Sequence, residues 1–575
     1  MSGPIVFLIP ARGGSRRIPG KNLRTVAGIP LVGHAIRVAR RTAALVGANA
    51  SIVCSTDDPE IARVARDWGA EIVDRPPNLA TDDATSVDVA IHALEALEAA
   101  GRRYHRLALL QPTSPLTSPT DVRAAIDRSE AADLAVVSVT ASHPVRFHVH
   151  ADGAGFLDGA PAAGGPDDRI LSGGFYVIDP ETLRTARAFV LPGRTLAFAV
   201  PPERGVDVDD WADMDLAGAL AAARPIRPLR IGGREIGAGG TFVIAEAGVN
   251  HDGDVEIAHR LVDAAADAGA TAVKFQTFDP TALASETAAT ADYQRAAGEG
   301  EGQREMLSRL ALPIDAWPVL QGHATDRGLV FLSTPFDDAS ADLLDRLDVP
   351  AFKVGSGELT NVPFLERLAA RGRPLILSTG MADMREVARA VDAIEAAGDP
   401  GVALLHCVSA YPADPADANL RAIETMRAAF AVPTGWSDHT DSIEIAVAAV
   451  AIGASIVEKH LTLDRTRSGP DHRASLEPDA FAAMVAEIGM VERALGSGEK
   501  QPTAAERPIA AVARRSLHWG ADVAAGTVVA EEHVVALRPG TGISPAALAT
   551  VVGRRLVRPA RAGLPVDPND LEDTP

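Results

Sequence analysis

Residues 4–22 read PIVFLIPARGGSRRIPGKN, an apolar run of strand length that leads into glycines and a dense basic cluster. Ligands of open α/β sheets bind beyond the carboxyl ends of the strands, so the run predicts a first strand and the following loop predicts a binding site. Arg12, Arg16, Arg17 and Lys21 gather in this loop. Because clustered cations beside free backbone N–H groups suit phosphate oxygens, we expect a phosphate cradle here.

The spacing of the glycines excludes two common nucleotide loops. A Walker loop needs Gly-x4-Gly-Lys followed by Ser or Thr. Here five residues separate Gly14 from Gly20, and Asn22 follows Lys21. The loop also lacks the dinucleotide pattern Gly-x-Gly-x-x-Gly, so the sequence predicts a phosphate site of another class.

Further apolar runs define the first domain. Strand-like segments at 51–56, 105–112, 133–139 and 173–179 alternate with Ala-rich helical patterns. This alternation predicts a doubly wound, mainly parallel α/β sheet. A helical stretch at 209–223 precedes RPIRPLRIGG, whose prolines and glycines favour a linker, so we place the first domain at residues 1–225.

A second series of eight apolar runs follows. Eight strand-helix units over about 250 residues are typical of a TIM (β/α)8 barrel, which we place at residues 226–500. We expect the irregular segment at 280–310 to form a lid over the barrel mouth. Short strands and Pro/Gly turns at 510–575 predict a small separate domain. The eight runs read FVIAEAG, AVKFQTF, LVFLSTPF, AFKVGSGE, PLILSTGM, VALLHCV, TGWSDHT and SIVEKHLT.

Composition limits the class of protein. The chain has 575 residues and a formal net charge of −21, which argues against a nucleic-acid binder and requires local cationic clusters for any anionic substrate. The longest apolar stretch is too short to span a bilayer, and the opening residues lack a signal-peptide pattern. Cys54 and Cys407 lie in apolar runs, which favours buried thiols in a reducing compartment. We therefore expect a cytoplasmic protein that binds neither nucleic acid nor membranes.

Polar residues cluster where the predicted barrel strands end, and these ends form the active-site face of a TIM barrel. Lys274 and Lys353 lie in apolar runs, where an unpaired ammonium is costly, so we expect an anionic ligand such as phosphoenolpyruvate. His439 and His460 end neighbouring strands and can share a metal with open positions. The other polar residues at these ends are Glu246, Asn250, His251, Gln276, Thr334, Ser356, Glu358, Ser378, Tyr411 and Ser437.

Six ordered motifs in the first domain resemble the CMP-sialic acid synthetase family of cytidylyltransferases. They are IPARGGSRRIPGKN, STDDPEIA, RPPNLATDDATS, LLQPTSPL, SGGFYVI and DVDD. Asp207 and Asp209 are two residues apart, so in an extended segment both carboxylates face one side and can hold Mg2+. The resemblance implies that this pair binds Mg2+, that Gln111 and Tyr176 face the sugar acid, and that Lys21 is catalytic. It also implies a CTP site that contains Arg12, Gly13, Ser15, Arg17, Lys21, Asn22, Arg75 and Ser86.

The barrel residues resemble the sialic acid synthase family. The motifs include IAEAGVNHDG, FKVGSGE, LLHCVSAYP, WSDHT, VEKHLT and SGPDHRASLEP, and the following RRSLHW, AGTVV and LRPGTG resemble its C-terminal antifreeze-like (SAF) module. The resemblance implies a homodimer in which Arg538 reaches into the partner's barrel. It implies that phosphoenolpyruvate condenses with an open-chain N-acetylhexosamine to a nine-carbon 2-keto acid, with Mn2+ or another divalent cation on His439 and His460 polarising the sugar aldehyde.

The same resemblance implies a role for each barrel residue. Glu246 and Glu358 act with the two histidines in catalysis. The hexosamine contacts Asn250, Ser409, Tyr411, Asp471 and Arg538. Phosphoenolpyruvate contacts Lys274, Gln276, Thr334, Lys353, Ser356, Ser378 and Ser437.

Together the two resemblances predict a bifunctional enzyme that makes a nonulosonic acid and activates it with CTP. Leu116-Thr117, Ser172-Gly173-Gly174 and Ser409 depart from the families' usual residues near the sugar, so the sugar stays open between N-acetylmannosamine and 2,4-diacetamido-2,4,6-trideoxymannose. An alternative keeps catalysis in one half and gives the other a binding or scaffolding role. Activation of an eight-carbon acid is disfavoured by the attached barrel.

Overall fold

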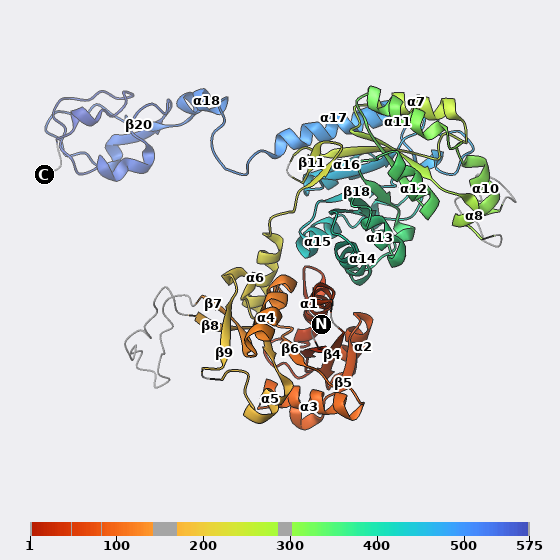
Figure 1. Ribbon diagram of the computed structural model, residues 1–575. Helices are drawn as coiled ribbons and strands as arrows, with labels where there is room; N and C mark the ends of the chain where they lie inside the picture. The colour runs from red at the N-terminus through yellow and green to blue at the C-terminus, as the bar shows by residue number, and fades with distance from the viewer. Residues whose placement is uncertain are drawn as a thin grey trace. The chain divides into compact units, whose positions relative to one another are not determined.

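The computed structural model describes residues 3–572 apart from 48, 82, 142–168, 192, 238 and 286–301. The chain forms two compact units, Met1–Ala494 and Leu495–Pro575 (Figure 1). The described part of the first unit contains a seven-stranded sheet and an eight-stranded sheet. Among the described residues, no helix combines the length and the apolar character needed to span a membrane.

The seven-stranded sheet confirms the predicted α/β class. Its order is β5-β4-β1-β6-β8-β7-β9, with β1 parallel to both neighbours and β8 antiparallel to β6 and β7. The side chains of Ile5 to Ile9 on β1 are fully buried, as the apolar run predicts. The strands are β1 (Ile5–Pro10), β4 (Ala50–Thr56), β5 (Glu71–Asp74), β6 (Arg106–Leu110), β7 (Ala135–Ala141), β8 (Arg169–Ile178) and β9 (Thr195–Ala199).

The sequence reading missed the two outermost strands, β5 and β9. Both are short and only partly buried, because each lies at an edge of the sheet and packs on one side only. Edge strands therefore carry a weak apolar pattern. The interior strands have the stronger signal.

Helices cover the faces of this sheet. On α1, Val32, Ala35, Ile36 and Ala39 are buried at helical spacing and pack in the core. A short hairpin, β2 (Thr25–Val26) and β3 (Ile29–Pro30), joins the basic loop to α1. The helices are α1 (Leu31–Val46), α2 (Pro59–Asp67), α3 (Ser86–Ala99), α4 (Pro119–Ala132), α5 (Pro180–Ala186) and α6 (Trp211–Ala222).

The eight-stranded sheet is the predicted barrel. Its order is β14-β13-β12-β19-β18-β17-β16-β15, every paired strand is parallel, and β14 and β15 pack together to close the ring. The strands are β12 (Phe242–Gly248), β13 (Ala272–Thr277), β14 (Val330–Pro335), β15 (Phe352–Val354), β16 (Leu375–Ser378), β17 (Val402–Cys407), β18 (Thr434–Asp438) and β19 (Ile456–His460).

Helices surround the barrel strands. The segment expected to form a lid contributes the short helix α8 and the helix α10, and the remainder of that expectation lies outside the described residues. The helices are α7 (Val255–Asp267), α8 (Pro280–Leu283), α10 (Gln303–Leu310), α11 (Ala316–Asp326), α12 (Asp338–Arg346), α13 (Val362–Ala369), α14 (Met384–Ala396), α15 (Arg421–Phe430), α16 (Glu444–Ala451) and α17 (Pro478–Leu495).

Part of the predicted linker is folded. Residues Leu229–Ile231 (β10) and Arg234–Ile236 (β11) form an antiparallel hairpin. Leu229, Ile231 and Ile236 are buried in one cluster with the first residues of the barrel strands. The hairpin therefore closes the amino-terminal end of the barrel as a plug. The sequence reading missed it because its three apolar residues lie among prolines and glycines and are recognisable only by their burial in the folded protein.

The second unit is small and has its own core. Its antiparallel strands β20 (Ser516–Trp519) and β21 (Val534–Leu537) pack with turns and short helices, and helix α18 (Glu506–Ala513) precedes them. Trp519 is buried with Leu517, Val523 and Leu556. This arrangement confirms the predicted small C-terminal fold.

The hairpin plug gives a stability prediction. Ile231→Ala should lower the free energy of unfolding by about 2–5 kcal/mol, because it removes buried methyl groups and leaves a cavity. The exposed neighbour Arg230 is the matched control, and Arg230→Ala should stay within about 0.5 kcal/mol of the parent. Urea denaturation followed by tryptophan fluorescence measures both values. Equal stabilities for the two variants would contradict the plug.

Candidate active sites

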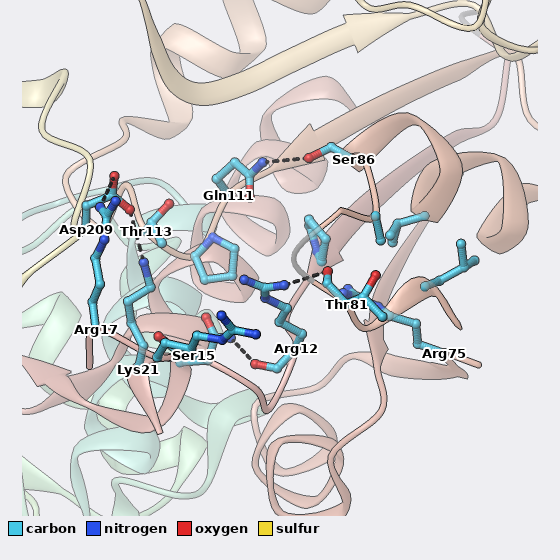
Figure 2. A pocket seen from close by; sticks show the side chains of 17 residues that line it. Arg12, Ser15, Arg17, Lys21, Arg75, Thr81, Ser86, Gln111, Thr113 and Asp209 are labelled. Carbon is cyan, nitrogen blue, oxygen red and sulfur yellow. Dashed lines mark hydrogen bonds and ion pairs between the residues drawn. The ribbon is translucent and has the colours of Figure 1, made fainter. Parts of the chain in front are cut away.

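A pocket of about 510 Å3 lies beyond the carboxyl end of β1 (Figure 2). Figure 2 shows Arg17 and Lys21 beside Asp209 at one end of the pocket and Arg75 at the other. The lining residues come from the basic loop, from segments that follow β5 and β6, and from the segment just before α6. They are Pro10, Arg12, Ser15, Arg16, Arg17, Lys21, Asn22, Arg75, Leu79, Thr81, Ala84, Ser86, Val89, Gln111, Pro112, Thr113 and Asp209.

The charge of this pocket favours an anion. Its lining contains four arginines and one lysine, whereas Asp209 is its single carboxylate among the described residues. Asp209 contacts Arg17 at 3.3 Å and Lys21 at 3.4 Å. Cations outnumber carboxylates in this lining, which suits a polyphosphate.

Hydrogen bonds to backbone carbonyls hold the basic loop in place. Arg12 donates to the Thr81 carbonyl at 2.6 Å, and the Asn22 amide donates to the Arg12 carbonyl at 2.9 Å. Lys21 donates to the Val208 carbonyl at 2.8 Å. These bonds tie the loop to two other segments, so its cations are positioned before a ligand arrives.

Arg75 and Gln111 reach the pocket from the sheet. Arg75 is buried and donates to the carbonyl and hydroxyl oxygens of Ser55, and burial lowers the pKa of its guanidinium. Gln111 donates to the Ser86 hydroxyl at 3.3 Å. Thr113 lines the same pocket, as does Thr81, which the sequence reading missed.

Three residues predicted for this site do not line the pocket. The Gly13 backbone N–H donates to Asp57, and a Cβ at Gly13 would come within 2.6 Å of the Asp58 carboxylate. Tyr176 packs against Phe189 with ring centroids 4.9 Å apart. Asp207 lies beside Gly173, where a Cβ would come within 3.3 Å of its carboxylate. Only Asp209 of the predicted Mg2+ pair therefore faces the pocket.

In the barrel, two buried lysines form ion pairs with two buried glutamates. Lys274 contacts Glu246 at 2.7 Å, and Lys353 contacts Glu458 at 3.2 Å. The second oxygen of Glu458 lies 3.9 Å from Lys274, so this carboxylate links the two lysines. The expectation that these ammonium groups need an external anion for charge balance is corrected, because the chain supplies two carboxylates.

The two glutamates have opposite pKa shifts. Burial raises the pKa of Glu246 to about 7, although Lys274 opposes the rise. Burial also acts to raise the pKa of Glu458, but Lys274 and Lys353 outweigh it and lower the value to about 2. Glu246 is therefore the carboxylate that can take up a proton near neutral pH, whereas Glu458 stays ionised.

Hydroxyl and amide groups extend this network. Lys274 donates to Thr334 and Lys353 donates to Ser378, while Gln276 donates to Glu246. Ser437 donates to Glu458 at 3.1 Å. The structure thus brings together most of the side chains assigned to phosphoenolpyruvate.

Ser356 and Ser409 lie around Gly380. The Gly380 N–H donates to Ser356 Oγ at 3.0 Å, and Ser356 contacts the buried Cys407. A Cβ at Gly380 would overlap Ser409, Cys407 and Ser356. Ser409, assigned to the hexosamine from the sequence, thus lies next to a residue assigned to phosphoenolpyruvate.

His439 and His460 fit the requirements of a shared metal. Their ring centroids are 5.5 Å apart, and both side chains are buried. Burial lowers the pKa of each imidazole, which keeps the ligating neutral form. His439 Nδ1 lies 2.7 Å from the Val408 carbonyl, which leaves Nε2 for a ligand. Among the described residues, no group of three or more His, Cys, Asp or Glu side chains is arranged to hold a metal ion.

The predicted hexosamine residues are only partly gathered. The Tyr411 ring lies 4.2 Å from the ring of His439, and the Asp471 carboxylate lies 3.9 Å from His460. Burial raises the pKa of Asp471 to about 6. Asn250 donates to the Leu461 carbonyl and to Ser475, so its amide nitrogen holds a loop.

The remaining two predicted residues are Glu358 and Arg538. The Glu358 carboxylate accepts from the Asn361 amide at 2.8 Å. Arg538 is exposed in the second unit.

The sequence reading missed Glu458, although its position carried a signal. It precedes His460 by two residues on β19, so both side chains point to the same side of that strand. It also missed Asp252, which contacts Arg467 at 2.8 Å and His472 at 3.1 Å and so fixes the loop before Ser475. No periodic pattern marks that contact, because its partners are distant in the chain.

Glu246 gives a pH prediction. Its folded pKa of about 7 lies above its ordinary value of 4.5, so ionisation is less favourable in the folded protein. Stability of the metal-free protein should therefore fall by up to about 3 kcal/mol as pH rises from about 4.5 to 7. Glu246→Gln should flatten this slope, whereas Glu256→Gln on α7 should not. Thermal unfolding across this range tests the assignment, and an unchanged slope in Glu246→Gln would contradict it.

Comparisons with known proteins agree with the three folded regions. The model of the NeuB family matches residues 261–500, a cytidylyltransferase model matches residues 6–147, and a SAF domain model matches residues 514–572. These matches confirm the families that the sequence motifs indicated.

Characterised relatives resemble a large part of the chain. It is 44% identical over 327 residues to N,N'-diacetyllegionaminic acid synthase of Legionella pneumophila, covering 56% of this chain and 92% of that protein. The synthase of the same name from Campylobacter jejuni is 41% identical, covering 53% and 92%. N-acetylneuraminate-9-phosphate synthase of Mus musculus is 40% identical, covering 45% and 72%. The chain therefore belongs to the NeuB family of sialic and legionaminic acid synthases, and the same polypeptide carries a cytidylyltransferase domain and a SAF domain.

Proposed function

We propose that the chain is a bifunctional enzyme that makes a nine-carbon 2-keto sugar acid in its barrel and converts that acid to a CMP conjugate in its first domain. The observation that carries the proposal is the presence of two different anion sites in one chain. One is the cation-rich pocket of the cytidylyltransferase domain, and the other is the paired-lysine cluster of the NeuB-family barrel.

In the barrel, Lys274 and Lys353 are proposed to bind the carboxylate and phosphate of phosphoenolpyruvate. Their present partners differ in acidity, since the pKa of Glu246 is about 7 and that of Glu458 is about 2. Protonation of Glu246 would free Lys274 for the substrate, whereas Glu458 would keep Lys353 oriented. A bond then forms between C3 of phosphoenolpyruvate and the sugar aldehyde carbon, water adds at C2, and the C2–O bond to phosphate breaks.

His439 and His460 are proposed to hold a divalent cation such as Mn2+, which when bound would supply Lewis-acid polarisation of the aldehyde. Tyr411 and Asp471 lie against these histidines and can orient the sugar. Glu246, once protonated, can return its proton to the new alkoxide. We further propose that the exposed Arg538 completes the sugar site of a partner subunit in a homodimer.

In the first domain, Arg12, Arg17, Lys21 and Arg75 are proposed to bind the triphosphate of CTP. Gln111, which donates to Ser86 at 3.3 Å, lies where the acceptor acid can meet the nucleotide. The anomeric hydroxyl of the acid attacks the α-phosphorus and pyrophosphate leaves. Asp209, the member of the predicted pair that lines the pocket, is proposed to hold Mg2+, which when bound would neutralise phosphate charge.

For the sugar, we propose 2,4-diacetamido-2,4,6-trideoxymannose, which gives N,N'-diacetyllegionaminate. The two legionaminic acid synthases align over 92% of their length, whereas the N-acetylneuraminate-9-phosphate synthase aligns over 72% of its length. Incubation with phosphoenolpyruvate, Mn2+ and each hexosamine, with phosphate release as the readout, distinguishes the candidates. Absence of phosphate release with every hexosamine would overturn the synthase assignment.

Two variants test the independence of the sites. Asp209→Asn should lower CMP transfer by about 100-fold or more and leave phosphate release from phosphoenolpyruvate unchanged, because it removes a charge from the nucleotide site alone. His460→Gln should do the reverse. Pyrophosphate and phosphate assays on the same preparations measure the two reactions.

Each variant has a matched control. Asp215→Asn lies in the exposed part of α6, and His406→Gln replaces an imidazole that bonds the Ala418 carbonyl. Both controls should retain both activities. Loss of both reactions in a folded Asp209→Asn or His460→Gln protein would contradict the two-site picture.

A further inference from the structure

The hairpin that follows the CTP loop touches the helices of the barrel. Its turn contains Gly28, which has φ +74°, and a Cβ there would come within 2.6 Å of Thr425 Cγ2 and 3.4 Å of Met384 Cγ. Thr425 belongs to α15 and Met384 to α14. All these residues lie in the first compact unit, so the hairpin packs on the outer surface of the barrel.

Helix α1, which continues from this hairpin, is joined to α14 by buried charge. Arg37 and Arg40 contact the two oxygens of Asp392 at 2.8 Å and 2.5 Å. The side chains of Arg37 and Asp392 are only 10% and 6% exposed. Arg41 pairs with Glu395 at 2.5 Å. Charges buried to this degree require matched partners, so the two helix faces are complementary.

A second group of contacts joins the end of the first domain to α15. Arg224 donates to the carbonyls of Ala428 and Ala429, in the last turn of α15. A cation at this end complements the helix dipole. The Arg37 guanidinium also lies 4.9 Å from the centroid of the Phe430 ring. The barrel thus holds α1 and the segment after α6 at once.

The docked hairpin is continuous with the ligand-binding part of the loop. Lys21 and Asn22, which line the CTP pocket, belong to a short helical turn that ends at Leu23, next to the hairpin. The Leu31 N–H donates to the Arg24 carbonyl, and His34 Nε2 lies 2.9 Å from the Val26 carbonyl, so the first strand of the hairpin is bonded to α1. Displacement of the hairpin from the barrel would therefore move Lys21 and Asn22.

We propose that docking on α14 and α15 holds the CTP loop in its binding conformation, with Asp392 and Thr425 of the barrel as positioning residues for the nucleotide site. The identity of the nucleotide rests on the proposed function. Neither residue contacts the pocket, and both act through the hairpin and α1. The barrel is in this way a structural part of the cytidylyltransferase.

The test uses the full chain with two barrel variants. Asp392→Ala removes the carboxylate that Arg37 and Arg40 share, and Thr425→Trp places bulk against the Gly28 turn. Each should weaken CTP binding by about fivefold or more in isothermal titration, the scale of coupling between linked sites. Each should leave the KM for phosphoenolpyruvate unchanged, because the synthase residues lie on other elements.

The controls repeat the chemistry elsewhere on the barrel. Asp342 of α12 also pairs with an arginine, Arg371. Thr325 of α11 donates to the carbonyl four residues before it, as Thr425 does. Asp342→Ala and Thr325→Trp should bind CTP like the parent protein.

Hydrogen exchange supplies a readout that needs no ligand. Amide protection over residues 11–28 should fall in Asp392→Ala and Thr425→Trp and stay at the parent level in the controls. Unchanged protection and unchanged CTP affinity in a folded variant overturn the inference. Failure of the parent itself to bind CTP overturns the nucleotide assignment, and exchange still decides the positioning role. If circular dichroism shows that Asp392→Ala is unfolded, Thr425→Trp decides alone.

Discussion

The pairing of buried charge is the constraint on which the barrel site depends. Lys274 and Lys353 are almost completely buried inside the barrel. An isolated ammonium group there would carry a large desolvation cost. Glu246 on β12 offsets that cost for Lys274 on the neighbouring strand β13, whereas Glu458 on β19 pairs with Lys353 on β15, a strand that is not its neighbour in the sheet. His460 lies opposite Glu246 in the register of β12 and β19, so the strand pairing brings one of the two histidines to the lysine–glutamate network.

The two candidate sites of the first unit differ in how the charge of their cationic side chains is balanced. The cation-rich pocket of the first domain is open to solvent, and water screens the charge of its arginines. The barrel lysines are buried and already paired with glutamates, so under the proposed function a substrate anion displaces a carboxylate. The high pKa of Glu246 provides for that exchange, because one proton converts an ion pair into a lysine that is available to a ligand.

The sequence predicted the elements whose signal is local. The barrel strands are apolar runs bounded by turns, and Lys274, Lys353 and His460 lie within these strands or at their ends, as parallel strands of this fold predict. The edge strands β5 and β9, and the hairpin of β10 and β11, depend on tertiary burial that no short pattern carries. The role of Glu458 was missed for a related reason. A strand-end carboxylate looks like any other polar residue until its two lysine partners are placed beside it.

The contact between α1 and α14 shows the same limit over a longer range. Asp392 lies among Ala390, Val391 and Ile394 on a helix that is buried over much of its surface. A carboxylate in that setting requires a cation, yet no lysine or arginine on its own helix is paired with it in the described structure. Its partners are 355 and 352 residues earlier in the chain. A barrel without the first domain would leave this carboxylate to water. In the fused chain it is instead the centre of a buried cluster, and the free energy of that cluster is available only when both domains are folded and in contact.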